Sequence, residues 1–402
     1  MKILLTVLLC LAIASSHAQN GIRDTIPKNT NGEKEVEEKT SDSLLLLQIQ
    51  KEMQEQATPS ASSPPTQQQS AVASANPRIS VIGDFRGLYR SYGDHNFDAI
   101  LNEAEFSFQS VVDPYARADF YYSVSEDPAT GEFTSEIEEA YLTTLSLPAH
   151  LQLKAGRFKQ QIGRINPVHP HALPFIDMPD AYVNFLGEEG LKGDGVSLSW
   201  LLPNHKFFQE LTFEATNVAE NPSFQRSKKN NYLYLAHLKN FWDLSDNETL
   251  ELGLTAMTGE NLMEKTTNMG AVDLTYKWKP VQFNTYKSLT FQNEFYYSHA
   301  KLDDESTVNA LGFYSMLDVQ VSKRYFLVGR FDYSNTPYSN EFVQKSGSLT
   351  LGWYATEFQK IELGTKYTTM NQALEENDYD KNFAQAFLRW IFVIGSHGAH
   401  SY

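Results

Sequence analysis

Charged side chains of both signs gather in one stretch of the chain, from Gln160 to Lys192 and just before it. They are Arg157, Lys159, Arg164, Asp177, Asp180, Glu188 and Glu189. Fixed charges along a water-filled path steer ions and set the field they cross. If this stretch borders such a path, these residues are expected to decide which ions pass.

Other charged residues recur at alternate positions along the rest of the chain. They are Arg86, Arg90, Glu103, Glu105, Arg117, Asp119, Arg330 and Arg389. Together with Arg157, Lys159 and Arg164, they are the candidate pore-lining or constriction residues. The alternative for each of them is pairing with a neighbouring strand, where it would only fill a polar interior.

Two pairs of histidines could in principle hold a metal ion. His169 and His171 flank Pro170, and His397 and His400 lie near the end of the chain. Imidazole nitrogens are ligands of zinc and related divalent ions. Since Pro170 stiffens the first pair and no clear carboxylate or thiol set completes either pair, we expect solvated loop histidines and no metal site.

Residues for covalent catalysis or a cofactor are sparse. The single cysteine, Cys10, falls in a predicted signal peptide, so the mature chain is expected to have no disulfide, thiolate metal site or cysteine nucleophile. Asp84, His95 and His299 could contribute to a hydrolase, but no nucleophile elbow or triad spacing accompanies them. We expect no enzyme and no cofactor; the alternative is a non-conducting barrel that acts as an enzyme or a binding or structural protein.

Strands must position these charges, because apolar and polar residues alternate with a period of two after Asn76. For example, Leu250, Leu252, Leu254 and Ala256 interleave with Glu251, Gly253 and Thr255. Strands are expected to start near Arg78, Glu103, Tyr115, Ser135, Leu151, Gly195, Phe207, Asn231, Thr249, Asn268, Lys287, Val308, Tyr325, Lys345, Ile361 and Asn382. The count of about sixteen is even, as in bacterial single-chain barrels.

The whole-chain composition favours a membrane barrel over a helical membrane protein. The mean hydropathy is −0.40, and no run of about 20 apolar residues follows the N-terminus. Aromatic residues make up 13% of the chain, which suits the aromatic girdles of outer-membrane barrels. We therefore predict an all-β fold, a transmembrane antiparallel β-barrel over residues 77–402. The aromatic last residue, Tyr402, is of the kind that the barrel-insertion machinery reads.

The N-terminus has the layout of a secretory signal peptide. Lys2 precedes the apolar stretch 3–14, and Ser16-His17-Ala18 predicts cleavage after Ala18. Residues 19–76 form a polar, low-complexity tail, expected to be periplasmic and disordered, with a short coil or transient helix at 43–56. The expected organisation is a signal peptide over 1–18, this tail and the barrel.

The charge balance limits the partners. The formal net charge of −16 argues against binding nucleic acid. Most of that charge falls within residues 77–402, so an acidic barrel is expected to prefer cations over anions.

One local motif carries a family resemblance. The run Gly156-Arg157-Phe158-Lys159 ends a predicted strand, and the long stretch 160–192 follows it. This layout resembles the phosphate-selective porin O and P family, in which such a strand precedes a long loop that folds into the pore. The resemblance implies a water-filled channel in the outer membrane of a Gram-negative cell, narrowed by the loop 160–192. Small ions or hydrophilic solutes would cross it by passive diffusion.

The resemblance also bears on partners and selectivity. It implies contact with outer-membrane lipid and the barrel-insertion machinery, and porins in general suggest a homotrimer. Anion selectivity in the family depends on basic residues at the constriction. Arg157, Lys159 and Arg164 would supply them, whereas the four acidic residues of the same stretch oppose that selectivity.

Overall fold

The computed structural model describes residues 77–92, 97–128, 130–203, 206–218, 221–225, 231–283, 286–372 and 381–395. The described residues belong to one compact unit, Gln67–Tyr402. The predicted signal peptide, the tail with its coil at 43–56, His95, His397, His400 and Tyr402 lie outside the described residues. Within the described part, no helix has the length and hydrophobicity needed to cross a membrane.

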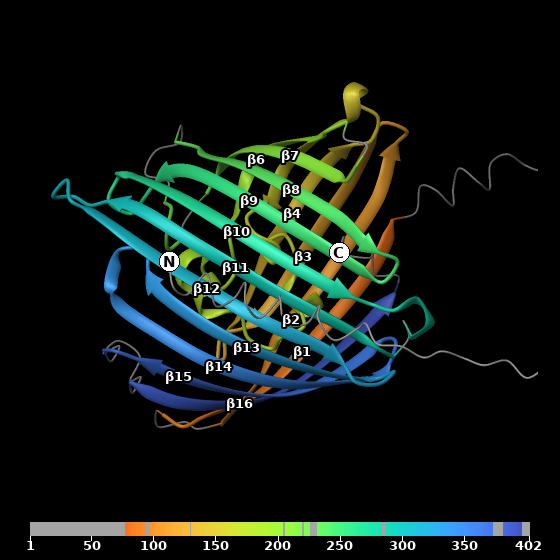
Figure 1. Ribbon diagram of the computed structural model, residues 1–402, viewed down its shortest axis with the longest axis vertical. Coiled ribbons are helices and arrows are strands. Elements are labelled where there is room, and N and C mark those ends of the chain that lie inside the picture. Colours follow the sequence, from red (N-terminus) through yellow and green to blue (C-terminus); the bar gives the residue numbers. More distant parts are fainter. Residues whose placement is uncertain are drawn as a thin grey trace, which may run out of the picture. The chain divides into compact units, whose positions relative to one another are not determined.

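This unit is a closed antiparallel barrel, as Figure 1 shows and as the alternation predicted. Its strands are β1 (Arg78–Arg90), β2 (Phe97–Asp113), β3 (Ala116–Glu126), β4 (Phe133–Thr144), β5 (Leu151–Lys159), β6 (Lys192–Leu201), β7 (Phe208–Asn217), β8 (Leu233–Ser245), β9 (Glu248–Glu260), β10 (Thr266–Trp278), β11 (Ser288–Lys301), β12 (Thr307–Gln320), β13 (Tyr325–Thr336), β14 (Ser339–Thr356), β15 (Gln359–Met370) and β16 (Asn382–Gly395). Each strand pairs with the next, and β1 pairs with β16 to close the ring. The predicted strand count is confirmed.

Most strands start within a few residues of the predicted positions, but two begin earlier. β2 begins at Phe97 rather than near Glu103, because its first residues still pair with the end of β1. β14 begins at Ser339 rather than near Lys345, after a tight turn in which Asn335 Nδ2 donates a hydrogen bond to the Phe342 carbonyl, 2.7 Å away. Pairing with a neighbour thus extends both strands into segments with weak alternation.

The two ends of the barrel differ in their connections. One end, here the turn end, carries the connection between β2 and β3 and every second connection after it, as well as residues 78 and 395. The other end, the loop end, carries the two longest connections, 160–191 and 218–232. The connection between β5 and β6 holds the 3-10 helix η2 (Pro170–Ala172) and the helix α4 (Asp180–Leu186).

The outer surface is apolar and has aromatic side chains near both ends. Exposed aromatics toward the turn end are Tyr115, Trp200, Phe208, Tyr325 and Trp353; those toward the loop end are Tyr89, Phe97, Phe133, Tyr234, Tyr297 and Tyr367. Aliphatic residues such as Leu254, Val272, Leu349 and Leu388 are exposed between them. Two aromatic girdles around an apolar band match the lipid-facing surface of a membrane barrel.

The inner surface is polar over much of its area but not all of it. Buried inward residues include Ser80, Asp84, Gln109, Thr212 and Glu251, which follows the expected alternation. One sector is apolar instead: Leu235, Met257, Met269, Ala271, Tyr296, Tyr314, Met316 and Val328 pack against apolar residues of the connection 160–191. The two-residue alternation does not predict this apolar sector, because it depends on a distant segment of the chain that covers it.

Candidate functional site

The connection between β5 and β6, residues 160–191, turns into the barrel and is called the inner loop below. In Figure 1 it is the yellow-green segment within the ring of strands. Phe175, Tyr182, Phe185 and other loop residues belong to a buried apolar cluster with residues of β8 to β13. The loop thus occupies part of the interior and is held there by apolar contacts.

A glycine just before the inner loop explains the motif that carries the family resemblance. Gly156 has φ +136°, and a Cβ on it would lie 2.2 Å from the carbonyl oxygen of Ala140. A side chain at this position would therefore strain or displace the pairing between β4 and β5. The barrel wall therefore requires glycine at position 156, the first residue of the Gly-x-Phe-Lys run, for its backbone conformation and for the space beside Ala140.

The two ends of the inner loop lie side by side and are fastened by Asn166. The backbone N–H of Gln160 donates to the Leu191 carbonyl at 3.0 Å. Asn166 Nδ2 donates to the carbonyls of Gln160 (2.7 Å) and Leu191 (2.9 Å), and its Oδ1 accepts from the Leu191 N–H (2.8 Å). Tyr182 of α4 donates its hydroxyl to the same Oδ1 at 3.0 Å. One buried amide thus closes the base of the loop.

Glu294 of β11 holds the beginning of the inner loop against the wall. Its Oε1 accepts the backbone N–H groups of Arg164 and Ile165 at 2.9 Å each, and the Tyr314 hydroxyl at 3.0 Å. Gly163 makes this approach feasible, since it has φ +60° and an added Cβ would lie 2.4 Å from Glu294 Oε2. A glycine is required here both for its left-handed backbone and for the space.

Replacing Gly163 by Ala is expected to loosen the inner loop without unfolding the barrel. Strain of this kind costs about 1–3 kcal/mol, and here it falls on the contact between the loop and Glu294. We expect faster hydrogen exchange and faster proteolytic cleavage within residues 160–191. Gly347→Ala is the matched control, because an added Cβ at Gly347 meets no atom within 4 Å. Equal rates in the two variants would contradict this account.

The middle of the inner loop is fastened by ion pairs to β13 and β15. Asp177 lies 2.8 Å from Arg330 Nη2 and 2.9 Å from Lys366 Nζ, and Asp180, at the start of α4, lies 2.6 Å from Lys366 Nζ. Burial opposes ionisation of Asp177, but Arg330 and Lys366 outweigh it and lower the pKa of that carboxyl below its ordinary value. Asp177 is therefore an ionised structural anchor of the inner loop.

Arg389 joins the closure of the barrel to the inner loop. Its Nε and Nη2 donate to the two carboxylate oxygens of Asp84, each at 2.9 Å, across the β1–β16 pair. Its Nη1 donates to the Phe175 carbonyl at 3.1 Å and lies 3.4 Å from Glu362 of β15. The guanidinium is fully buried, so its hydrogen bonds replace those it would make with water.

The histidines of the inner loop are buried, so the expectation of solvated loop histidines is wrong for this pair. His169 and His171 are 2% and 7% exposed. His169 Nδ1 lies 2.8 Å from Glu105 and 3.1 Å from Glu138, and its Nε2 lies 2.8 Å from Glu139. Burial alone would lower the pKa of His169, but the three carboxylates raise it well above the ordinary value. The sequence next to His169 offers no carboxylate partners for it. Its partners come from distant strands instead: Glu105 from β2, and Glu138 and Glu139 from β4.

A bulge explains why two consecutive glutamates point inward. The register of β3 and β4 shifts between Tyr121, which pairs with Glu139, and Tyr122, which pairs with Ile137. Glu138 is the extra residue, and Glu138 and Glu139 are only 2% and 5% exposed. A bulge places two residues opposite one and redirects their side chains. Two consecutive glutamates within a predicted strand are the sequence feature that could have indicated this bulge.

Two cavities lie on opposite sides of the segment that carries these histidines. The loop-side chamber has a volume of about 750 Å³ and is lined by Glu103, Glu138 and Pro170 among others. The turn-side chamber measures about 610 Å³, and its lining includes Glu139 and His169. As far as the described residues go, the two chambers have no lining residue in common.

Most of the predicted lining residues face the interior. Arg86 and Glu103 line the loop-side chamber, and Arg117, Asp119, Lys159 and Arg164 line the turn-side chamber. Glu105, Arg330 and Arg389 are buried in ion pairs, while Arg90 pairs with Asp98. Arg157 instead has the orientation of the exposed Leu153 and Val196 and pairs with Asp194 at 2.8 Å, so it does not belong with the interior set. Four further buried acidic residues of the interior, Glu138, Glu139, Glu294 and Asp332, were not among the predicted residues.

Comparison with known proteins yields one relative by sequence. No family model matches the chain, so the narrower resemblance to the O and P family remains a prediction. The chain is 28% identical over 363 residues to an uncharacterized protein of Aquifex aeolicus (strain VF5), covering 78% of this chain and 74% of that protein.

Comparison of the folds yields outer-membrane porins and channels. An anion-selective porin from Comamonas acidovorans superposes with a TM-score of 0.56 at 8% sequence identity. The superposition covers 79% of this chain and 99% of that one. The outer-membrane channel DcaP of Acinetobacter baumannii gives 0.53 at 11% identity (80% and 98% covered), and OprB of Pseudomonas putida gives 0.51 at 10% (82% and 96%). This chain therefore has the closed barrel fold of outer-membrane porins.

Proposed function

We propose that this protein is an outer-membrane porin through which small ions or hydrophilic solutes diffuse passively. The observation that carries the proposal is the reversal of polarity across the wall: an apolar outer surface with two aromatic girdles surrounds an interior with polar chambers. Such a wall is suited to lipid outside and water inside. Insertion by the barrel-assembly machinery and a homotrimeric state are part of the proposal.

The inner loop is the proposed constriction. Its histidine segment stands between the two chambers, and Glu294, Arg330, Lys366 and Arg389 hold it from several sides of the wall. A solute crossing the barrel would have to pass this segment. The strength of its attachment favours a fixed filter over a freely moving gate.

The two chambers carry opposite charge. Asp and Glu dominate the loop-side chamber. Its lining includes the acidic residues Glu103, Glu136, Glu138, Asp177, Asp180, Glu188 and Glu189, but only two basic residues, Arg86 and Lys366. Lys192, paired with Glu136 and Glu189, and Arg330, paired with Asp177, offset only part of this charge. Lys and Arg are in excess in the turn-side chamber: Arg117, Lys154, Lys159, Arg164, Lys239, Lys277 and Lys360 face Asp119, Glu139, Glu251, Asp318 and Glu362. The proposed path thus runs from an acidic to a basic region, and uniform cation preference no longer follows from the net charge.

Conductance of the full mature chain in a planar lipid bilayer tests the function directly. Discrete steps in current after insertion are the expected result. A protein that inserts as a stable, heat-modifiable barrel but stays silent would contradict the proposal and favour a non-conducting barrel. The hydrolase residues considered for that alternative are not assembled: Asp84 is buried against Arg389, whereas His299 contacts Asn309 at 2.7 Å.

The opposed charges predict that current through the pore depends on the sign of the voltage. Ions accumulate in a path with one acidic and one basic end under one polarity and are depleted under the other. We expect asymmetric current–voltage curves in 0.1 M KCl, where the Debye length is about 10 Å, and nearly symmetric ones at 1 M, where it is about 3 Å. Membranes with protein inserted from one side give the measurement. Symmetric curves at low salt would contradict this charge arrangement.

Phosphate selectivity is not part of the proposal. Of the three basic residues that the family resemblance assigned to the constriction, Lys159 and Arg164 line the turn-side chamber, but Arg157 lies with the outward residues. The acidic loop-side chamber would also repel an approaching anion. Reversal potentials in KCl and potassium phosphate gradients distinguish a general porin from a phosphate-selective one.

A further inference from the structure

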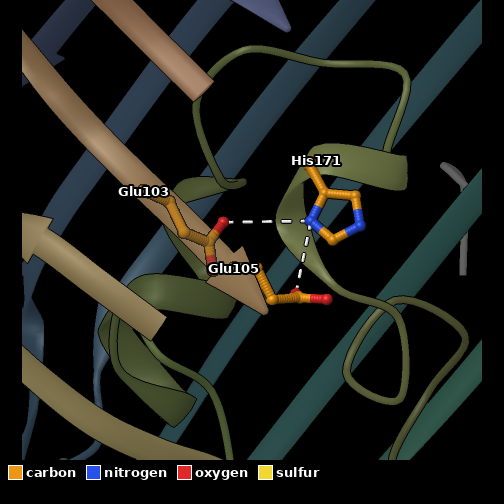
Figure 2. Close-up of side chains that lie close together, drawn as sticks. All are labelled: Glu103, Glu105 and His171. Atoms are coloured by element: carbon orange, nitrogen blue, oxygen red, sulfur yellow. Dashed lines mark ion pairs between the residues drawn. The ribbon is translucent and has the colours of Figure 1, made fainter. Parts of the chain in front are cut away.

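Three buried side chains converge where the inner loop meets β2. Figure 2 shows Glu103 and Glu105 projecting from the strand toward His171 of η2. The Nδ1 of His171 lies 3.9 Å from Glu103 Oε2 and 3.5 Å from Glu105 Oε2. One ligand atom of each residue lies within 4.8 Å of those of the other two, and all three residues are buried.

These separations suit a shared metal ion better than direct hydrogen bonds. Ligand atoms bound tetrahedrally at about 2.0–2.2 Å from zinc lie about 3.3–3.6 Å from one another, and His171 Nδ1 is at about that spacing from Glu105. Hydrogen bonds are shorter, about 2.7–3.0 Å, as seen around the neighbouring His169, whose two ring nitrogens lie 2.8 Å from Glu105 and Glu139. His169 is therefore held by direct ion pairs, whereas His171 Nδ1 stands 3.5 Å from Glu105 and 3.9 Å from Glu103, distances that one ion could bridge.

The charge of the surroundings also favours a divalent cation. Glu103, Glu105, Glu138 and Glu139 are all buried, and His169 contacts three of them. Carboxylates gathered this closely repel one another unless a cation or a proton lies between them. Buried carboxylates require compensation, and one doubly charged ion would supply it.

Glu105 gives an independent indication of a bound ion. Its side chain is fully enclosed, with no solvent-exposed area. Its Oε1 nevertheless receives no hydrogen bond from any residue that the structure describes. A buried acceptor oxygen without a donor is rare in folded proteins. An ion bound by both oxygens of Glu105 would satisfy Oε1, while Oε2 also pairs with His169 Nδ1 at 2.8 Å.

We propose that Glu103, Glu105 and His171 bind one divalent transition-metal ion. The imidazole nitrogen selects zinc and its first-row neighbours over magnesium and calcium, which prefer oxygen ligands. Access is from the loop-side chamber, which Glu103 and Pro170 line. The ion joins η2 to β2 and so fastens the inner loop at the partition between the chambers. This inference goes beyond the proposed channel activity and does not depend on it.

Zinc binding by the full chain, refolded in detergent without a polyhistidine tag and freed of metal by a chelator, tests the proposal. Isothermal titration and elemental analysis should give one Zn²⁺ per chain. His171→Gln and Glu105→Gln should each lower the affinity by at least about tenfold, while His299→Gln, at a half-buried histidine outside the cluster, should not change it. The double variant H397Q/H400Q separates this site from the C-terminal histidines.

Binding lost in H397Q/H400Q but kept in His171→Gln, or no zinc binding at all, would overturn the proposal. Should His171→Gln fail to refold, X-ray absorption at the zinc edge of the unmodified protein decides. One imidazole with oxygen ligands supports the site, whereas two or more imidazoles exclude it. Because none of these measurements involves conductance, failure of the metal site and failure of the channel are separate results.

Discussion

Arg389→Met is expected to destabilise the folded barrel by about 3–5 kcal/mol, the range for removing one partner of a buried ion pair. The substitution removes the bidentate partner of Asp84 and one of the two cations beside Glu362, and both carboxylates are almost fully buried. Asp84 then keeps Arg86, 3.2 Å away, and Glu362 keeps Lys360, 2.7 Å away. It also removes the donor to the Phe175 carbonyl of the inner loop. Because Asp84 and Arg389 lie on the two strands that close the ring, the effect should include slower formation of the closed barrel.

Urea titrations in lipid vesicles, followed by tryptophan fluorescence and by gel mobility without heating, measure this effect. Arg157→Met is the matched control. That arginine also forms an ion pair, but its side chain is 40% exposed and that of its partner Asp194 is 59% exposed, so the loss should be under about 1 kcal/mol. Similar losses in the two variants would contradict the distinction between the inner and outer faces.

Replacing residues 162–189 by a short glycine–serine turn is expected to raise the single-channel conductance several-fold. The excision is feasible because the Gln160 N–H and the Leu191 carbonyl are already hydrogen-bonded at 3.0 Å. It removes the segment between the chambers and joins them into one wide path. Planar-bilayer recordings of the excised and complete chains give the comparison.

Removing the loop also uncovers the apolar sector of the wall, including Met257, Met269 and Tyr296. Exposure of this surface to water should reduce stability, so gel mobility and the circular-dichroism spectrum must first show that the variant is a folded barrel. Met257→Thr and Met269→Thr in the excised chain should restore part of the stability. An unchanged conductance in a folded excised barrel would show that the inner loop does not limit the flow.

The period-two alternation determined the fold at the level of strands and faces. Polar and apolar residues on opposite faces of each strand are a local property, so Glu251 could be placed inside and Leu254 outside without knowledge of their neighbours. A wall that is apolar outside requires closure in lipid, because every strand edge must be paired. The antiparallel barrel and its strand count therefore followed from the sequence.

The candidate site depended on contacts that no local pattern contains. Asp84 and Arg389 are 305 positions apart and meet only when β1 pairs with β16. The bulge that turns Glu138 and Glu139 inward is a register shift against β3, and the path of the inner loop is set by its apolar packing on distant strands. His169 and His171 looked like solvated loop residues for this reason: burial and charge compensation are properties of the closed barrel, while alternation reports only which way a strand residue points.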